Sequence, residues 1–209
     1  SGYGGSVAAL APLERALTDA GREVVVMTPV GSGTGDLAAQ AEALDDIARA
    51  TLADLDASSV DVVGYSAGGV VARSWVRDHG GDEVARRVLT LGSPHHGTRV
   101  AELAGNLFGD CAAACRQLVP DSDFLRALNA GDETPAGPAY ISVWTSSDEI
   151  VVPPDSARLD GALGLVVQDF CPDARTRHGG LPGSPVVLAT LASALGPDAP
   201  GEPTVEDCR

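Results

Sequence analysis

Ser66 is the residue of this chain whose surroundings best suit a nucleophile. It stands at the centre of the sequence Gly-Tyr-Ser-Ala-Gly, with Gly64 and Gly68 two residues away on either side. The β-branched run 60–65 predicts a strand that ends at this serine, and apolar residues at helical spacing over 67–79 predict the helix that follows. A serine in a tight strand-to-helix turn, with glycines where the two elements come close, has the layout of a nucleophile elbow. The alternative is an ordinary glycine-rich turn with an inert serine.

A serine hydroxyl is a poor nucleophile alone, so it needs a histidine base and a carboxylate that orients the base. Where a doubly wound α/β fold carries such a set, the chain order is serine, acid, histidine. Of the four histidines, only His178 lies late enough, in a glycine-containing loop before the last predicted helix. Asp148 follows the strand predicted at 139–145, so it would emerge at the carboxyl end of the sheet and is the expected acid. The competing carboxylates are Glu149, Asp155, Asp169 and Asp173.

His95 and His96 are a second, tempting pair of residues for chemistry. They lie in the loop after the strand predicted at 88–91, and they precede the expected acid in the chain. We therefore interpret both as structural: one would shape the loop, and the other would line the edge of the cleft.

Backbone N–H groups beside the serine could stabilise an oxyanion. Ala67 opens the predicted helix, so its N–H would point at the space next to the Ser66 hydroxyl. The second donor should come from a loop near the front of the chain. The glycine-rich segment 1–6 fits this role, with the Tyr3 N–H as the expected donor. A disordered chain terminus is the competing interpretation.

The elements that must position these groups alternate between helix and strand. Periodicity predicts helices at 8–20, 37–55, 67–79, 122–129 and 185–195, and strands at 23–27, 60–65, 88–91, 139–145 and 164–169. Alternation of this kind predicts an α/β fold with a mostly parallel central sheet flanked by helices. We expect a single domain over 1–209, with a Pro- and Asp-rich tail at 196–209 that runs over the surface.

Composition limits the classes of partner. A net charge of −15 argues against nucleic acids and anionic membranes, because a phosphate-binding surface needs clustered Lys and Arg. No apolar run is long enough for a membrane span, and no charged, apolar leader stands at the N-terminus. Neither a C-x-x-C pair nor a Cys/His cluster appears, so we expect no metal site.

The four cysteines permit three pairings, of which spacing favours one. Cys111 and Cys115 are close enough to bridge locally, and Cys171 with Cys208 would then fasten the C-terminal tail to a loop. Two disulfides would suit a secreted, extracellular protein. Four buried free thiols in a cytosolic protein are the alternative.

Five segments together carry a family resemblance. They are Gly-Tyr-Gly-Gly-Ser at 2–6, Gly-Tyr-Ser-Ala-Gly-Gly at 64–69, Gly-Ser-Pro-His-His-Gly-Thr at 92–98, Asp-Glu-Ile-Val-Val-Pro at 148–153, and His-Gly-Gly-Leu at 178–181. With these segments in this order, the chain resembles the compact secreted bacterial lipases of the α/β-hydrolase superfamily, over nearly its whole length.

The resemblance implies carboxylic ester hydrolysis through a serine acyl-enzyme. Ser66 would be the nucleophile, His178 the base and acid, and Asp148 the residue that orients the histidine. The N–H groups of Tyr3 and Ala67 would form the oxyanion hole. The implied partner is an ester or lipid substrate, including lipid at an oil–water interface, and no metal or organic cofactor is required. We expect a secreted monomer.

Two departures from these lipases affect the prediction. Such lipases carry an apolar strand directly before the oxyanion loop, and none precedes Ser1 here, so we expect an open groove between neighbouring elements. Our hypothesis is that the chain is trimmed upstream of residue 1, and the alternative is that another segment fills the gap. There is also no insertion large enough for a cap domain. Leu103, Leu107 and Phe108 would instead form a small apolar wall at the acyl site, although core packing explains them equally well.

Other functions share this machinery or this fold. A cutinase-like polyester hydrolase and an acyltransferase would use the same triad, and the sequence does not separate them from a lipase or esterase. A non-catalytic binding protein with an α/β-hydrolase fold is the remote alternative from a different class. An open cleft would favour short to medium acyl esters or exposed polymer chains.

Overall fold

The computed structural model describes residues 1–108, 111–196, 200 and 202–208. These residues include a parallel sheet in the order β1-β2-β3-β4, made of β1 (Val60–Tyr65), β2 (Ala85–Leu91), β3 (Ala139–Trp144) and β4 (Leu163–Val166). Because the strands are parallel, their carboxyl ends meet at one edge of the sheet. Ser66 follows β1 and Asp148 follows β3, so both lie at this edge.

The helices are α1 (Ala11–Asp19), α2 (Leu37–Asp54), α3 (Ala67–Asp78), α4 (Arg99–Phe108), α5 (Ala113–Gln117), α6 (Asp123–Leu128), α7 (Val167–Phe170) and α8 (Pro185–Ala194). Local sequence explains several of their starts. Asp36 accepts from the Ala38 N–H before α2, and Ser122 accepts from the Leu125 N–H before α6. Pro185 is the first residue of α8, where a missing N–H leaves no hydrogen bond unmade.

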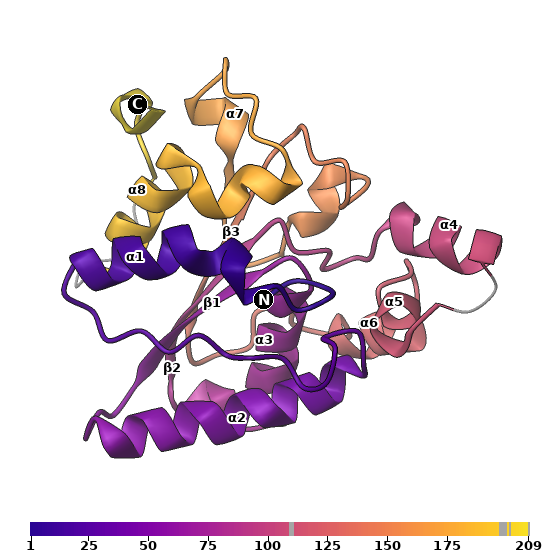
Figure 1. The fold of residues 1–209 in the computed structure, drawn as a ribbon, viewed down its shortest axis with the longest axis horizontal. Helices are drawn as coiled ribbons and strands as arrows, with labels where there is room; N and C mark the ends of the chain where they lie inside the picture. The colour runs from indigo at the N-terminus through magenta and orange to yellow at the C-terminus, as the bar shows by residue number, and fades with distance from the viewer. Residues whose placement is uncertain (109–110, 197–199, 201, 209) are drawn as a thin grey trace.

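Helices cover both faces of the sheet (Figure 1). On one face, α1 and α8 share a hydrophobic cluster with Leu89 and Ile141. On the other face, α2 and α3 share a second cluster with Val88 and Tyr140, which α4, α5 and α6 extend. Neighbouring residues of β2 and β3 thus point to opposite faces, as strand geometry requires, and each face is apolar. The predicted α/β fold with a parallel, helix-covered sheet is confirmed.

The prediction of a strand at 23–27 is wrong. Its valines have the β-branched composition of a strand, but residues 22–29 adopt no regular structure. A strand needs a hydrogen-bonded neighbour, and a cavity of about 470 Å³ lies between this segment and β1. The cavity is lined largely by apolar side chains, among them Val24, Leu44, Val62 and Val71. Among the described strands, β1 is therefore an edge strand whose outer side faces this groove.

The C-terminal part differs in one detail from the prediction. The strand predicted at 164–169 ends at Val166, and α7 follows at Val167. The two disulfides join Cys111 to Cys115 and Cys171 to Cys208, which is the pairing that the spacing favours. Cys208 packs against the cluster of α1 and α8, so the described part of the tail is fastened to the domain.

A membrane-spanning helix was not expected from the sequence. None of the helices within residues 1–108, 111–196 and 202–208 has the length and apolar character to cross a bilayer.

Candidate active site

Ser66 occupies the turn between β1 and α3 with a strained backbone. Its φ of +54° and ψ of −127° lie in a region that residues with a side chain rarely adopt. The Ser66 N–H donates to the carbonyl of Leu91 at 2.8 Å, and the Ser66 carbonyl accepts from the Gly69 N–H at 3.0 Å. A Cβ on Gly64 would lie 2.5 Å from the Cα of Gly69, so strand and helix approach this closely only because Gly64 has no side chain.

Ser66, His178 and Asp148 form a continuous line of hydrogen bonds. His178 Nε2 lies 3.0 Å from Ser66 Oγ, and His178 Nδ1 lies 2.8 Å from Asp148 Oδ2. All three residues are buried. With the proton on Nδ1, the ring donates to the carboxylate and Nε2 accepts from the serine hydroxyl, which is the state that a general base needs. The structure thus brings together the three side chains that the sequence analysis selected.

The carboxylate of Asp148 is held in place by the loop that carries it. Asp148 Oδ1 accepts from the N–H groups of Ile150 at 2.9 Å and Val151 at 2.8 Å, which leaves Oδ2 to face His178. Among the described residues, Asp148 is the carboxylate that hydrogen bonds to the His178 ring. Glu149, the nearest competitor in sequence, instead accepts from the His178 backbone N–H at 3.3 Å.

The segments that carry the two expected oxyanion donors lie beside the serine. Ala67 is the first residue of α3, where an N–H has no acceptor within its own helix. The loop of Tyr3 approaches closely, because a Cβ on Gly2 would lie 3.1 Å from Ser66 Cβ. Figure 1 shows the N-terminus next to the start of α3. Tyr3 itself is 48% exposed, and the oxyanion roles of Tyr3 and Ala67 stay predictions.

A comparison with protein families identifies the group to which this sequence belongs. The model of the class 2 lipases matches residues 50–161, which is more than half of the chain. The chain belongs to the class 2 lipase family. The matched region contains Ser66 and Asp148, whereas His178 lies beyond it. No curated protein sequence matches the chain.

Solved structures, two of them of lipases, share the fold of this class 2 lipase family member. Lipase B of Aspergillus fumigatus superimposes with a TM-score of 0.83 at 20% identity, over 97% of this chain and 52% of that one. The chain therefore spans about half the length of the fungal lipase. The mature lipase BlEst2 of Bacillus licheniformis gives 0.62 at 19% identity, over 78% and 79% of the two chains. The lin2722 gene product of Listeria innocua gives 0.64 at 15% identity, over 97% and 94%.

His95 and His96 connect the loop after β2 to the rest of the molecule. His95 is fully buried, its Nε2 lies 3.1 Å from Thr90 Oγ1, and its carbonyl accepts from Asn129 at 2.9 Å. Burial, and then the charges of Arg73 and His96, hold the pKa of His95 well below 6.5. His96 Nε2 lies 2.7 Å from a carboxylate oxygen of Glu133. These contacts support a structural role for both histidines.

The expected apolar wall falls on α4. Leu103 is 58% exposed, and Leu107 and Phe108 end the helix with side chains that lie outside the described residues. Figure 1 shows α4 at the periphery of the molecule, beyond the sheet. The substrate-binding role of these three residues stays a prediction.

Metal binding and the backbone contacts of His178 are the remaining features of the candidate site. The described residues hold no group of three or more His, Cys, Asp or Glu side chains that could bind a metal ion. Two contacts on the backbone of His178, from Tyr65 and Glu149, were missed by the sequence analysis. Their only signal in the sequence is position, since Tyr65 precedes Ser66 and Glu149 follows Asp148.

Proposed function

We propose that the chain is a carboxylic ester hydrolase, a lipase or esterase, that acts through a serine acyl-enzyme. The observation that carries the proposal is the hydrogen-bonded line from Ser66 Oγ through the His178 ring to Asp148. Membership of the class 2 lipase family supports the same class of reaction. Ser66 in a strained turn at the carboxyl edge of the sheet is the position in which such a nucleophile works.

In acylation, Ser66 Oγ attacks the carbonyl carbon of the ester while His178 Nε2 takes the hydroxyl proton. The positive charge that forms on the imidazole is stabilised by Asp148, whose other oxygen is already fixed by two N–H groups. The carbonyl oxygen becomes an oxyanion, which the N–H groups of Ala67 and Tyr3 would bind. His178 then gives its proton to the alcohol oxygen as the ester bond breaks.

In deacylation, the same groups act on water. His178 Nε2 removes a proton from a water molecule, whose oxygen attacks the acyl carbon, and the proton then returns to Ser66 Oγ as the acid leaves. The chemistry therefore needs no group beyond those of the chain. The two disulfides support an extracellular location for the enzyme, and the proposed substrates are triacylglycerols or other carboxylic esters.

The decisive experiment compares wild type with Ser66→Ala on p-nitrophenyl butyrate and p-nitrophenyl palmitate at pH 8. We expect wild type to hydrolyse at least one ester and Ser66→Ala to lose about 10⁴-fold to 10⁶-fold in kcat, because the nucleophile is gone. Ser74→Ala is the matched control, since Ser74 is also a buried serine but its hydroxyl lies 3.4 Å from Asp78, in its own helix.

Two results would contradict the proposal in different ways. If wild type is inactive on both esters, the proposal that the chain is an ester hydrolase is wrong. If Ser66→Ala keeps full activity, the chain is an enzyme but Ser66 is not its nucleophile. Added methanol separates the acyltransferase from the hydrolase, because an acyltransferase would form mainly the methyl ester.

A further inference from the structure

The backbone of His178 is held at both of its polar groups by side chains from other segments. The His178 N–H donates to Glu149 Oε2 at 3.3 Å. The His178 carbonyl accepts from the Tyr65 hydroxyl, also at 3.3 Å. The Tyr65 ring also lies against the imidazole, with ring centroids 5.2 Å apart and planes tilted by 34°.

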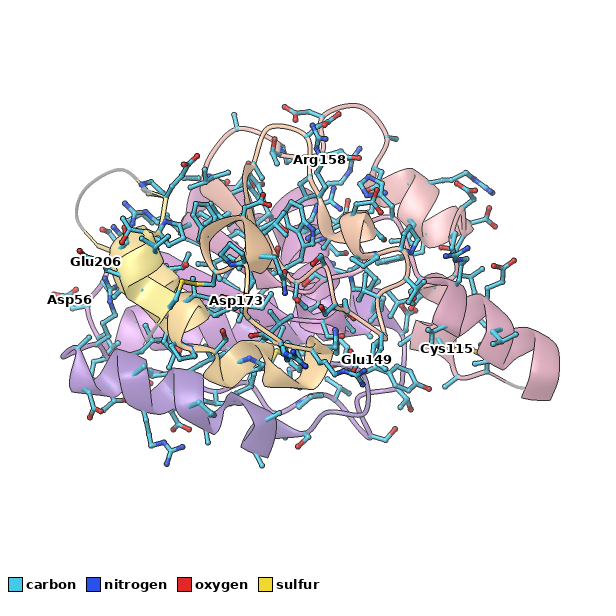
Figure 2. All side chains as sticks on the ribbon, turned by 90° about the horizontal axis from the view of Figure 1, so that it is seen from above. Asp56, Cys115, Glu149, Arg158, Asp173 and Glu206 are labelled. Atoms are coloured by element: carbon cyan, nitrogen blue, oxygen red, sulfur yellow. A yellow bond between two sulfur atoms is a disulfide. The ribbon has the colours of Figure 1, made fainter. Side chains whose placement is uncertain are left out.

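The two partners come from the segments that carry the other residues of the proposed triad. Tyr65 is the last residue of β1 and is bonded directly to Ser66, and Glu149 directly follows Asp148. Each of these two segments thus contacts His178 twice, once at its ring and once at its backbone. Glu149 is labelled in Figure 2, and its carboxylate accepts from the His178 N–H.

We propose that Tyr65 and Glu149 are positioning residues that fix the backbone of His178, so that its ring stays within reach of both Ser66 and Asp148. This inference rests on the proposed function of these three residues. His178 begins the 3₁₀ turn His178–Gly183, in a loop after α7, and such a loop does not itself fix a side chain to the accuracy that proton transfer needs.

The chemistry of both contacts suits this role. Burial first, and then the negative charges of Asp148 and Glu149, raise the pKa of Tyr65 to about 12, so its hydroxyl keeps its proton and remains a donor. The Glu149 carboxylate is a charged acceptor, which makes a stronger hydrogen bond to an N–H than a neutral oxygen makes. Glu149 is exposed, so its replacement leaves the core of the protein intact.

The test uses Tyr65→Phe, which removes only the hydroxyl, and Glu149→Ala, which removes the acceptor. Each should lower kcat for p-nitrophenyl butyrate by about tenfold to 100-fold with KM within about twofold of wild type, because a displaced base slows the chemical step. Glu149→Gln keeps an acceptor oxygen and should recover most of the lost kcat.

Matched controls separate this role from a general effect of truncation. Tyr140→Phe is the control for Tyr65→Phe, because it also removes a buried hydroxyl, but one that has no hydrogen-bond partner among the described residues. Asp155→Ala is the control for Glu149→Ala, because it removes an exposed carboxylate from the same loop region. Both should keep the kcat of wild type. A second readout is the residual rate of ester hydrolysis when each substitution is combined with His178→Ala. In this background, Tyr65→Phe and Glu149→Ala should lower the rate no further.

The outcomes distinguish the inference from the function on which it rests. If Ser66→Ala abolishes activity while Tyr65→Phe and Glu149→Ala both match wild type, the positioning role fails and the proposed function stands. The role also fails if either variant lowers the rate by the same factor with and without His178. If Ser66→Ala keeps full activity, the function and this inference fail together.

Discussion

At the residue level, His95 is a histidine that the fold keeps uncharged. It lies fully buried within the loop after β2, and its pKa is held well below 6.5 by burial and by the nearby charges. The unfolded chain, in which this imidazole has an ordinary pKa, therefore binds more protons than the folded protein at mildly acidic pH. The free energy of unfolding must fall as the pH falls below about 6.5, by at most about 1.4 kcal/mol per pH unit from this one group.

We expect His95→Gln to flatten this pH dependence. Urea unfolding at pH 7.5 and pH 5.5 should show a smaller loss of stability on acidification for His95→Gln than for wild type, whatever the variant's absolute stability. His79→Gln is the control, because His79 is only partly buried, and it should keep the slope of wild type. Equal slopes for His95→Gln and wild type would show that His95 does not limit stability in acid.

Residue identities in the site could be predicted to different extents. Ser66, Asp148 and His178 could be selected because chain order and the ends of predicted strands are visible in a sequence, and the structure brings them together. Their roles stay predictions. The contacts of Tyr65 and Glu149 could not be predicted, because each depends on where a backbone group of a distant loop lies in space.

At the level of elements, the end of β2 sets the space available to the site. Gly92 follows β2 with a φ of +53°, and its N–H donates to the Val143 carbonyl at 2.8 Å. A Cβ at this position would lie 2.6 Å from Leu181 Cδ1, 3.2 Å from Asp148 Oδ2 and 3.3 Å from His178 Nδ1. A side chain at position 92 would therefore be strained, and it would crowd Leu181 and the Asp148–His178 pair.

We expect Gly92→Ala to lower both stability and activity. A side chain at positive φ costs about 1–2 kcal/mol, and the added methyl must also push on the Asp148–His178 pair. The expected kcat on p-nitrophenyl butyrate is at least about tenfold lower, with thermal unfolding measured in parallel. Gly105→Ala in α4 is the control, since a Cβ there would meet no atom closer than 3.9 Å. Wild-type kcat in Gly92→Ala would show that the site tolerates this displacement.

Most elements could be predicted because their signals are local. The strand that ends at Tyr65 and the helix that starts at Ala67 agree with the structure at those boundaries, since composition and the flanking glycines mark them. The prediction of a strand at 23–27 failed because a strand depends on more than its local sequence. Its valines give the β-branched signal, but a strand also needs a partner, and a partner is a property of the whole sheet.

At the level of the whole molecule, the described strands form a sheet between two apolar layers, and β1 lies at one edge of this sheet. The layers of α1 with α8 and of α2 with α3 cover both faces, but the edge of β1 faces the cavity beside residues 22–29. Asp61, which pairs with Arg22 and Arg86, is among the polar residues that line this groove. The net charge of −15 acts on the whole surface and opposes association with anionic partners.

The open side of β1 has a consequence for amide hydrogen exchange. Alternate N–H groups of a strand point to opposite sides, and the N–H groups of Val60 and Ser66 donate to the β2 side of the sheet. The amides of Val62 and Gly64 therefore point to β2, whereas those of Asp61 and Val63 point to the cavity.

We expect deuterium exchange in the 209-residue chain, followed by NMR, to alternate along this single strand. The amides of Asp61 and Val63 should exchange at least about tenfold faster than those of Val62 and Gly64, because water reaches only the unpaired side. Uniformly slow exchange would mean that another segment covers the edge in solution. The exchange rates of four consecutive amides thus report, residue by residue, whether the sheet of this protein ends at β1.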